Sequence, residues 1–142
     1  MLFKNILVPY DGSSHSKHSF KVALDMAKKY NSKISMVTVL DTSTGWWAHT
    51  NLWDNAMVGA KTLVAREFES FESVAKKAKV SFHSEIIESK SVTKAIVSYS
   101  KSKKIDLMVM GAQGITGWDK LVLGSVTDGV VHRVRCPVLI VR

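Results

Sequence analysis

Short apolar runs alternate along the chain with segments in which apolar residues recur every three or four positions. The first run, Phe3 to Pro9, has the length of a strand. Ser13 then begins a segment with helical periodicity. Its apolar positions fall on one face: Phe20, Ala23, Leu24 and Ala27. The chain is therefore predicted to begin with a strand followed by a helix.

The same order returns in the middle of the chain. A strand is predicted from Ile34 to Leu40, and an amphipathic helix follows after a long connection. The apolar face of this helix is formed by Val64, Phe68, Phe71, Ala75 and Ala78. Residues 80–87 then alternate between apolar and polar side chains, which is typical of a partly exposed strand.

The last third of the chain adds two helices and two strands. Ser91 is expected to cap a third helix, and the apolar run Ile105 to Met110 predicts a buried strand. Ser125 and Asp128 have the spacing of a capping box at the start of a fourth helix. Residues 137–141 are expected to form a fifth strand.

Strands that alternate with helices in this way indicate an α/β protein with one domain over residues 1–142. The expected architecture is Rossmann-like, an open five-stranded parallel sheet with helices on both faces and right-handed crossovers. Ligands of such sheets bind beyond the carboxyl ends of the strands, where the strand order reverses. The turns after the first and fourth predicted strands, at residues 9–14 and from Gly111, are therefore the expected site.

A cluster of glycines follows the fourth predicted strand. Gly111, Gly114 and Gly117 precede the pair Gly124-Ser125, at which the fourth helix is expected to begin. Glycines let the backbone approach a ligand closely, and the free amides of a first helical turn attract phosphate. Each glycine alone is better explained by a tight turn or a cap, but the joint spacing favours a phosphate-binding loop. It is not a Walker A loop, because the required Lys-Ser or Lys-Thr is absent.

On these residues the chain resembles the universal stress protein family. The nucleotide-binding branch of that family has the signature G-x2-G-x9-G-[ST], which Gly111, Gly114, Gly124 and Ser125 match without a gap. The opening Ile6-Leu-Val-Pro-Tyr-Asp11-Gly-Ser13 and the ending Cys136-Pro-Val-Leu-Ile-Val-Arg142 are also similar to it. The resemblance extends over essentially the full chain.

The resemblance implies a protein that binds ATP or AMP, with or without Mg²⁺, on a sheet of strand order 3-2-1-4-5. It implies that Asp11 lies near the ribose, that the backbone of Val39 reads the adenine edge, and that the glycine loop and Ser125 hold phosphates. It also implies homodimers paired through the last strand, Val138 to Val141. The residues expected to contact the nucleotide are Pro9, Tyr10, Asp11, Val39, Met110, Gly111, Gly114, Ile115, Gly117, Gly124, Ser125, Val126 and Thr127.

Two places depart from the family pattern. After the third predicted strand, many relatives have a Gly-x-Pro turn where this chain has Glu88-Ser-Lys-Ser91. Many relatives carry Arg or Lys where this chain has Ile115, so Lys120 is the only basic residue between Gly111 and Ser125. The substitution removes a possible phosphate cation. The choice between ATP and AMP therefore stays open.

Residues 41–60 form a connection that is long for a compact domain. The stretch is expected to be a functional loop or to be partly helical. It holds three of the four tryptophans, Trp46, Trp47 and Trp53. Exposed aromatic rings here would serve as a lid over the nucleotide or as a surface for a protein partner, whereas packed rings would cover the sheet edge and the dimer contact.

Charge and cysteine content narrow the class of partner. Twenty Lys and Arg against 12 Asp and Glu give a net charge of +8, which makes polyanions and nucleotides candidate ligands. Nucleic-acid binding is supported only by this charge and is not expected. A lone cysteine, Cys136, favours a reducing cytoplasm, and the strand-sized apolar runs predict no membrane span.

Much of the charge has a simple explanation. Nine lysines lie at or just beyond predicted helix C-termini, where cations complement the helix dipole and face away from the expected site. They are Lys28, Lys29, Lys33, Lys76, Lys77, Lys79, Lys101, Lys103 and Lys104.

No constellation of catalytic residues is evident, and neither a catalytic residue nor a metal site is expected. His15 and His18 could approach a phosphate or a metal near Asp11, but solvated histidines are far commoner. Three glutamates are expected on the exposed face of the second helix: Glu67, Glu69 and Glu72. The leading prediction is a dimeric adenine-nucleotide-dependent stress or signalling regulator. The alternatives are a slow ATPase or nucleotidyl-transfer enzyme on the same scaffold, and a partner-binding regulator that does not need nucleotide.

Overall fold

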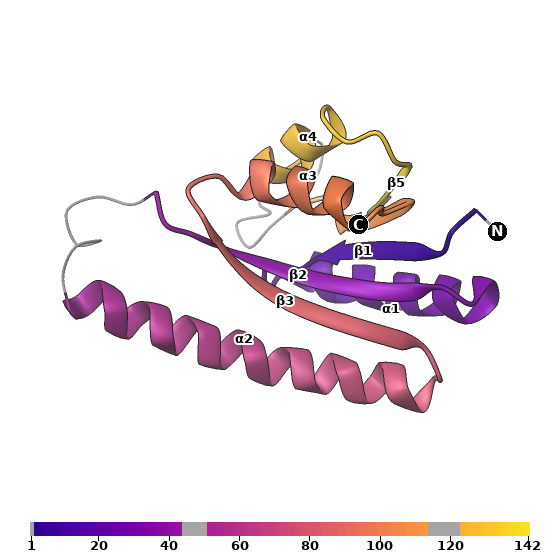
Figure 1. Ribbon diagram of the computed structural model, residues 1–142, viewed down its shortest axis with the longest axis horizontal. Coiled ribbons are helices and arrows are strands. Elements are labelled where there is room, and N and C mark those ends of the chain that lie inside the picture. The colour runs from indigo at the N-terminus through magenta and orange to yellow at the C-terminus, as the bar shows by residue number, and fades with distance from the viewer. Residues whose placement is uncertain (1, 44–50, 114–122) are drawn as a thin grey trace.

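A computed structural model describes residues 2–43, 51–113 and 123–142, without the side chains of residues 51–53 (Figure 1). Its five strands form one parallel sheet in the order β3-β2-β1-β4-β5. Central β1 pairs with β2 and β4, and Ile6 lies opposite both Ile34 and Leu107. The strands are β1 (Asn5–Pro9), β2 (Lys33–Asp41), β3 (Ser81–Ser89), β4 (Leu107–Gly111) and β5 (Val138–Val141). The Rossmann-like fold and the strand order 3-2-1-4-5 are therefore confirmed.

The helices cover both faces of the sheet (Figure 1). They are α1 (Ser14–Tyr30), α2 (Asn51–Lys77), α3 (Val92–Ser102) and α4 (Ser125–Val131). On one face, Phe20 of α1 and Phe68 of α2 pack against the strands. On the other face, Ile96 and Tyr99 of α3 and Val130 of α4 form a second cluster. Both faces of β1 and β4 are buried, which explains why their sequences are almost continuously apolar.

Serine caps begin two of the helices as predicted. The Ser13 side chain accepts a hydrogen bond from the Ser16 amide at 3.1 Å, and Ser91 accepts one from the Lys94 amide at 3.2 Å. These bonds satisfy amides that the helical ladder leaves open. The expected starts of α1 and α3 are therefore confirmed.

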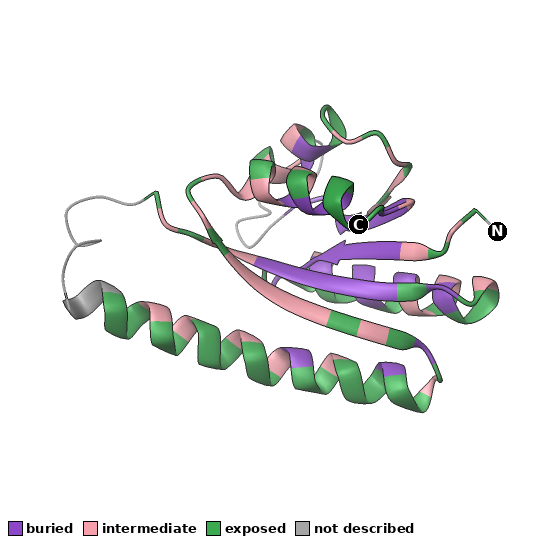
Figure 2. Ribbon diagram, viewed as in Figure 1, coloured by how far each residue is buried: buried purple, intermediate pink, exposed green. Residues whose placement is uncertain are grey.

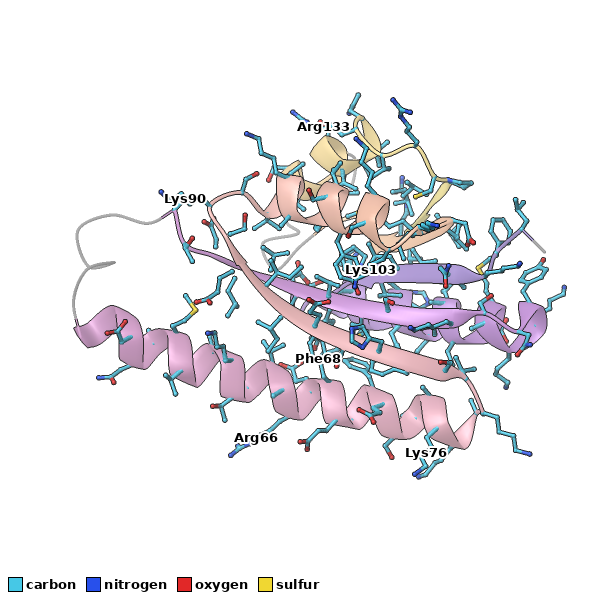
Figure 3. All side chains as sticks on the ribbon, in the orientation of Figure 1. Arg66, Phe68, Lys76, Lys90, Lys103 and Arg133 are labelled. Carbon is cyan, nitrogen blue, oxygen red and sulfur yellow. The ribbon has the colours of Figure 1, made fainter. Side chains whose placement is uncertain are left out.

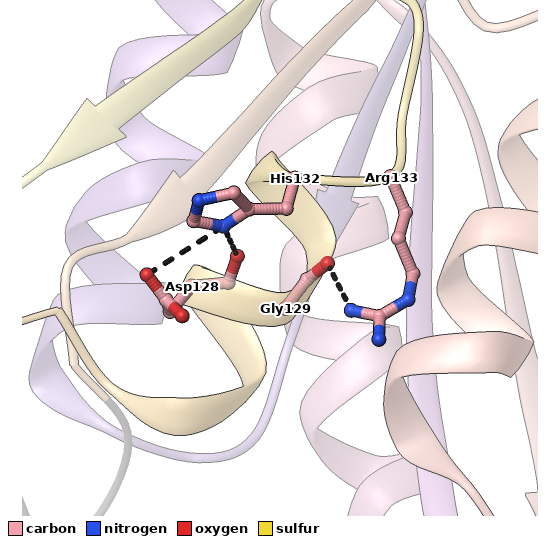
Figure 4. Close-up of polar contacts among 4 residues, drawn as sticks. All are labelled: Asp128, Gly129, His132 and Arg133. Carbon is pink, nitrogen blue, oxygen red and sulfur yellow. Dashed lines mark hydrogen bonds and ion pairs between the residues drawn. The ribbon is translucent and has the colours of Figure 1, made fainter.

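The predicted capping box of α4 is wrong. The cap is Gly124, which makes no side-chain bond, and Ser125 is the first helical residue. The Gly124 amide donates to the Ala112 carbonyl at 2.8 Å, which fixes Gly124 in an extended conformation beside the end of β4. The Asp128 carboxylate instead lies 3.7 Å from Nδ1 of His132, one turn further on (Figure 4).

Three helices end in the same way. Asn31, Lys79 and Lys104 have left-handed backbone conformations, with φ of 55°, 59° and 52°. In each case the next amide donates back to a carbonyl five residues earlier, as from Ser32 to Ala27, Val80 to Ala75 and Ile105 to Ser100. Each closure leads within three residues into β2, β3 or β4.

Part of the long connection after β2 is helical. Helix α2 begins at Asn51 and runs for 27 residues, and most of its surface is exposed (Figure 2). Trp46 and Trp47 lie outside the described residues, and the same holds for the Trp53 side chain. Despite its length, α2 is not apolar enough to cross a membrane, and neither is any other helix in the described part of the chain.

Candidate functional site

A cavity of about 250 Å³ opens at the carboxyl ends of β1, β2 and β4, beneath the first turns of α3 and α4. This is the place where the strand order reverses, between β1 and β4. The predicted site residues that line the cavity are Pro9, Tyr10, Asp11, Val39, Met110, Gly111, Gly124, Ser125, Val126 and Thr127. The other three predicted residues, Gly114, Ile115 and Gly117, lie outside the described residues.

The turn between β1 and α1 fixes one carboxylate at the cavity rim. Oδ1 of Asp11 accepts hydrogen bonds from the Ser13 amide and the Ser16 hydroxyl, both at 2.9 Å. Gly12, with φ of 87°, gives the turn a conformation that side chains rarely adopt. No partner for Oδ2 of Asp11 is found among the described residues. The carboxylate is thus oriented by its own helix start, with one oxygen available to a ligand hydroxyl.

Backbone groups of Val39 face the same space. The Tyr10 amide donates to the Val37 carbonyl at 2.8 Å, so the amide and carbonyl of Val37 point toward β1. In a parallel strand the groups two residues on point the same way, which directs those of Val39 beyond the end of β1. In the described chain no backbone hydrogen bond reaches Val39 from that side. A donor and an acceptor are therefore presented side by side, as an adenine edge requires.

The start of α4 forms the opposite wall. The Thr127 hydroxyl donates to the Gly111 carbonyl at 2.8 Å and ties the helix to the end of β4. The first amide of the helical ladder is that of Asp128, which donates to the Gly124 carbonyl at 2.8 Å. The amides of Ser125, Val126 and Thr127 come before it and so have no partner within the helix. All three of these residues line the cavity.

Gly111 is required by packing against α1. It is the last residue of β4, and a Cβ atom there would lie 2.6 Å from the Cβ of His15 and 3.1 Å from its carbonyl carbon. The glycine therefore allows the first turn of α1 to pack against the strand end. The glycine spacing alone does not predict this contact.

Sequence reasoning misses six lining residues, namely Ser13, Ser16, Val37, Val92, Ile96 and Gln113. Together with Met110, the aliphatic members give the cavity an apolar wall suited to a planar base. Val92 and Ile96 are four residues apart at the start of α3. A right-handed crossover from β3 to β4 places that turn over the carboxyl ends of the strands, so the topology would have identified them.

The Tyr10 ring is directed away from the cavity. It packs edge-on against Phe71 at 5.1 Å between centroids, and its hydroxyl donates to Glu67 on α2. The expectation that Glu67 lies on a solvated face with Glu69 and Glu72 is therefore wrong. Glu67 is half-buried because it accepts the hydroxyl of a buried tyrosine, whereas Glu69 and Glu72 are exposed.

Asp11 is the only charged residue among the described residues that line this cavity. A ligand here would be held by backbone groups, hydroxyls and apolar contacts. In the described chain no three of the side chains His, Cys, Asp and Glu come together as metal ligands. Of the two histidines near Asp11, His18 bonds through Nδ1 to the Arg142 carbonyl at 2.9 Å, and His15 packs beside Gly111.

Comparison with known proteins gives the family. The model of the universal stress protein family matches residues 2–142. The chain belongs to the universal stress protein family. It is 32% identical to the universal stress protein MJ0531 of Methanocaldococcus jannaschii, over 99% of this chain and 83% of that protein.

Solved structures of this family share the fold. UspA from Lactobacillus plantarum superposes with a TM-score of 0.81 at 26% identity, covering 100% of this chain and 99% of that one. A universal stress protein family member from Burkholderia pseudomallei gives a TM-score of 0.78 at 21% identity, covering 99% and 96%. The family resemblance read from the glycine spacing is thus confirmed.

Proposed function

We propose that this universal stress protein binds an adenine nucleotide in the cavity at the carboxyl ends of β1, β2 and β4. One observation carries the proposal. An apolar wall, the open backbone edge of Val39 and the free amides at the start of α4 converge on one cavity of about 250 Å³. These features match the base, its hydrogen-bonding edge and a phosphate in turn.

Two proteins of the same fold support the choice of ligand class. One universal stress protein is known in complex with cAMP, and its structure covers this chain fully with a TM-score of 0.71 at 23% identity. The universal stress protein from Archaeoglobus fulgidus is known in complex with dAMP, with a TM-score of 0.71 at 18% identity. Because the described lining contains a carboxylate and no lysine or arginine, we expect AMP to bind at least as tightly as ATP.

Calorimetric titration of ligand-free protein with AMP, and with ATP in the presence and absence of Mg²⁺, tests the proposal. A matched pair of variants on α4 locates the site, because Val126 lines the cavity whereas Val131 is 37% exposed outside its lining. Val126→Trp should fill the cavity and weaken AMP binding by about tenfold or more, and Val131→Trp should leave it within about twofold. Absence of AMP binding at millimolar concentration, or equal losses in both variants, would refute the proposal.

We further propose that the protein is a homodimer paired through β5. This strand is a sheet edge, and Leu139 in it is 39% exposed. The carbonyls of Pro137 and Val141 accept from the amides of Met108 in β4 and Ala112 just after it, so the amides of Val138 and Ile140 face the open edge. Ile140→Pro removes one outward amide without breaking a bond to β4. Sedimentation should show a dimer for the parent chain and a monomer for this variant, with AMP binding retained.

In this proposal the nucleotide-bound dimer is a cytoplasmic regulator in the stress response. Residues 41–60, which lead from β2 into α2, are the proposed surface for a protein partner. Tyr10 connects the cavity with α2, the helix into which this segment leads, because it lines the cavity and donates to Glu67 on α2. Tyr10→Phe removes the bond, and we expect it to weaken any AMP-dependent change in protease sensitivity along α2. If Tyr10→Phe leaves the AMP-dependent cleavage pattern unchanged, the bond between Tyr10 and Glu67 does not transmit AMP binding to α2.

A further inference from the structure

A second cavity lies at the opposite end of the sheet, near the amino ends of β4 and β5. Its volume is about 200 Å³. Four cationic residues line it: Lys101 and Lys104 from the end of α3, and Arg133 and Arg135 from the segment between α4 and β5. Figure 3 labels Arg133 beside α4, away from the sheet centre. The two arginines are separated from each other by Val134, which packs against the core.

No ion pair joins these four side chains to an acidic residue in the described part of the chain. Asp106 is the acidic residue at this end of β4. Its carboxylate accepts the amides of Lys4 and Asn5 at 3.0 and 3.1 Å, and its charge contributes to the raised pKa of the Cys136 thiol in the cavity lining. Arg133 uses one N–H to donate to the Gly129 carbonyl at 2.9 Å (Figure 4), which fixes the guanidinium and leaves its other donors open. Lys101, Lys104 and Arg135 have no hydrogen-bond or ion-pair partner for their side chains within residues 2–43, 51–113 and 123–142.

Helix dipoles account for three of these four cations. Arg133 follows the end of α4 and donates to the Gly129 carbonyl in its last turn. Lys101 and Lys104 lie at the C-terminus of α3, where cations are favoured. Arg135 lies four residues beyond the end of α4, at the entry to β5, and no helix terminus explains it. Cys136 also lines the cavity, and burial raises the pKa of its thiol, so this group adds no negative charge at neutral pH.

We propose that this cavity binds a small anion with two or more phosphate groups, at a site separate from the adenine cavity. Arginine guanidinium groups bind phosphate oxygens in pairs, and the two lysines supply point charges opposite them. The volume of about 200 Å³ suits one or two phosphate groups, and all four cations are exposed at its mouth. A nucleic acid or an acidic protein would instead need an extended surface, and neither would gain from the cavity.

Titration with inorganic tripolyphosphate at low ionic strength tests the proposal. We expect a Kd below about 1 mM, and a loss of about tenfold or more in the double variant Lys101→Gln/Arg135→Gln. The matched control is Lys28→Gln/Lys29→Gln, which removes the same charge from the end of α1, outside the cavity lining. It should change the Kd by less than about twofold. Thermal unfolding of both variants checks that each is folded.

Three results would overturn the proposal: no binding by the parent chain, equal losses in the two double variants, or a folded Val126→Trp variant that loses tripolyphosphate as well as AMP. The first two results would show that the four cations do not form a specific binding site. The third would place the bound phosphate in the adenine cavity. A single-stranded oligonucleotide that binds more than about tenfold tighter than tripolyphosphate, and that is weakened equally by both double variants, would assign the charge to nucleic acid instead.

Discussion

The two ends of the sheet carry cavities of similar size and opposite chemistry. The carboxyl end has a cavity of about 250 Å³ whose described lining includes one carboxylate and no cation. The amino end has one of about 200 Å³ lined by two lysines and two arginines. Helix α3 contributes to both, with Val92 and Ile96 at its start and Lys101 at its end.

The difference follows from which atoms face each end. At the carboxyl end, strand termini and helix starts supply backbone amides and carbonyls, so recognition depends on where the main chain runs. At the amino end, helix C-termini attract cations, and side chains supply the chemistry. The first cavity should therefore be sensitive to tight packing, and the second to charge and salt.

The largest expected effect is on packing at the carboxyl end. Gly111→Ala places a Cβ atom 2.6 Å from the Cβ of His15, and it should lower the free energy of unfolding by about 1–3 kcal/mol. The control is Gly59→Ala on α2, where no atom lies within 4 Å of the new Cβ, and it should raise stability by about 0.5–1 kcal/mol. Urea unfolding measures both. Equal stability of the two variants would show that the end of β4 can relax.

Salt distinguishes the two cavities directly. Raising the ionic strength from about 0.05 to 0.5 M should weaken tripolyphosphate binding about tenfold, because exposed charges are screened over a shorter distance. Binding of adenosine, which is uncharged, should change by less than about twofold over the same range. Calorimetric titration of each ligand makes the comparison. A salt-independent Kd for tripolyphosphate would contradict the proposed role of the four cations.

Ionisation of Tyr99 in α3 should make the stability of the fold depend on pH in the alkaline range. Burial raises the pKa of Tyr99, and the nearby Glu85 carboxylate adds to the effect. The native state then holds this proton to higher pH than the unfolded chain does. Its stabilising contribution is therefore lost as the pH rises through the tyrosine range, near 10.

Denaturant unfolding at a series of pH values from neutral to alkaline measures this loss. Tyr99→Phe should flatten the decline in stability above about pH 10, because the titrating group is gone. Tyr30→Phe, at the end of α1, should keep the decline, since Tyr99 is still present. An unchanged slope in the Tyr99→Phe variant would mean that other groups set the alkaline limit.

The smallest effect compares two lysines with left-handed backbones. Lys79→Gly and Lys104→Gly should each stabilise the fold by about 1 kcal/mol, because glycine adopts φ near 59° and 52° without strain. Only Lys104 lines the amino-end cavity. Both variants should therefore gain in thermal stability, but Lys104→Gly alone should weaken tripolyphosphate binding. Equal affinities would exclude Lys104 from the site.

Periodicity in the sequence is enough to predict the strands and helices, because burial on one or both faces requires apolar residues at regular spacing. It also locates the cavity at the carboxyl end of the sheet, because Asp11 and Ser125 follow predicted strands. What it does not show is set by tertiary contacts. Gly124 rather than Ser125 caps α4, and its amide bonds to the carbonyl of Ala112, just after β4. A local sequence pattern does not reveal such a contact between a helix start and a strand end.

Two other features could not be predicted from the sequence, because they too depend on tertiary contacts. Glu67 is partly buried because Tyr10, the residue after β1, reaches it across the sheet face, which helical spacing within α2 does not reveal. The amino-end cavity combines α3 with the segment after α4, so its four cations are scattered between residues 101 and 135. Strand order itself came from the family resemblance, because periodicity identifies strands without saying which ones are neighbours.

The hydrogen bonds that end α1, α2 and α3 in the same way affect how the protein unfolds locally. Each helix is hydrogen-bonded through Ser32, Val80 or Ile105 to the chain that enters the next strand. A helix and the strand after it should then open together and exchange their amide hydrogens as one cooperative unit. The boundaries of such units would fall at the carboxyl ends of the strands. Opening of the α3–β4 unit would accordingly change both cavities, because α3 lines each of them.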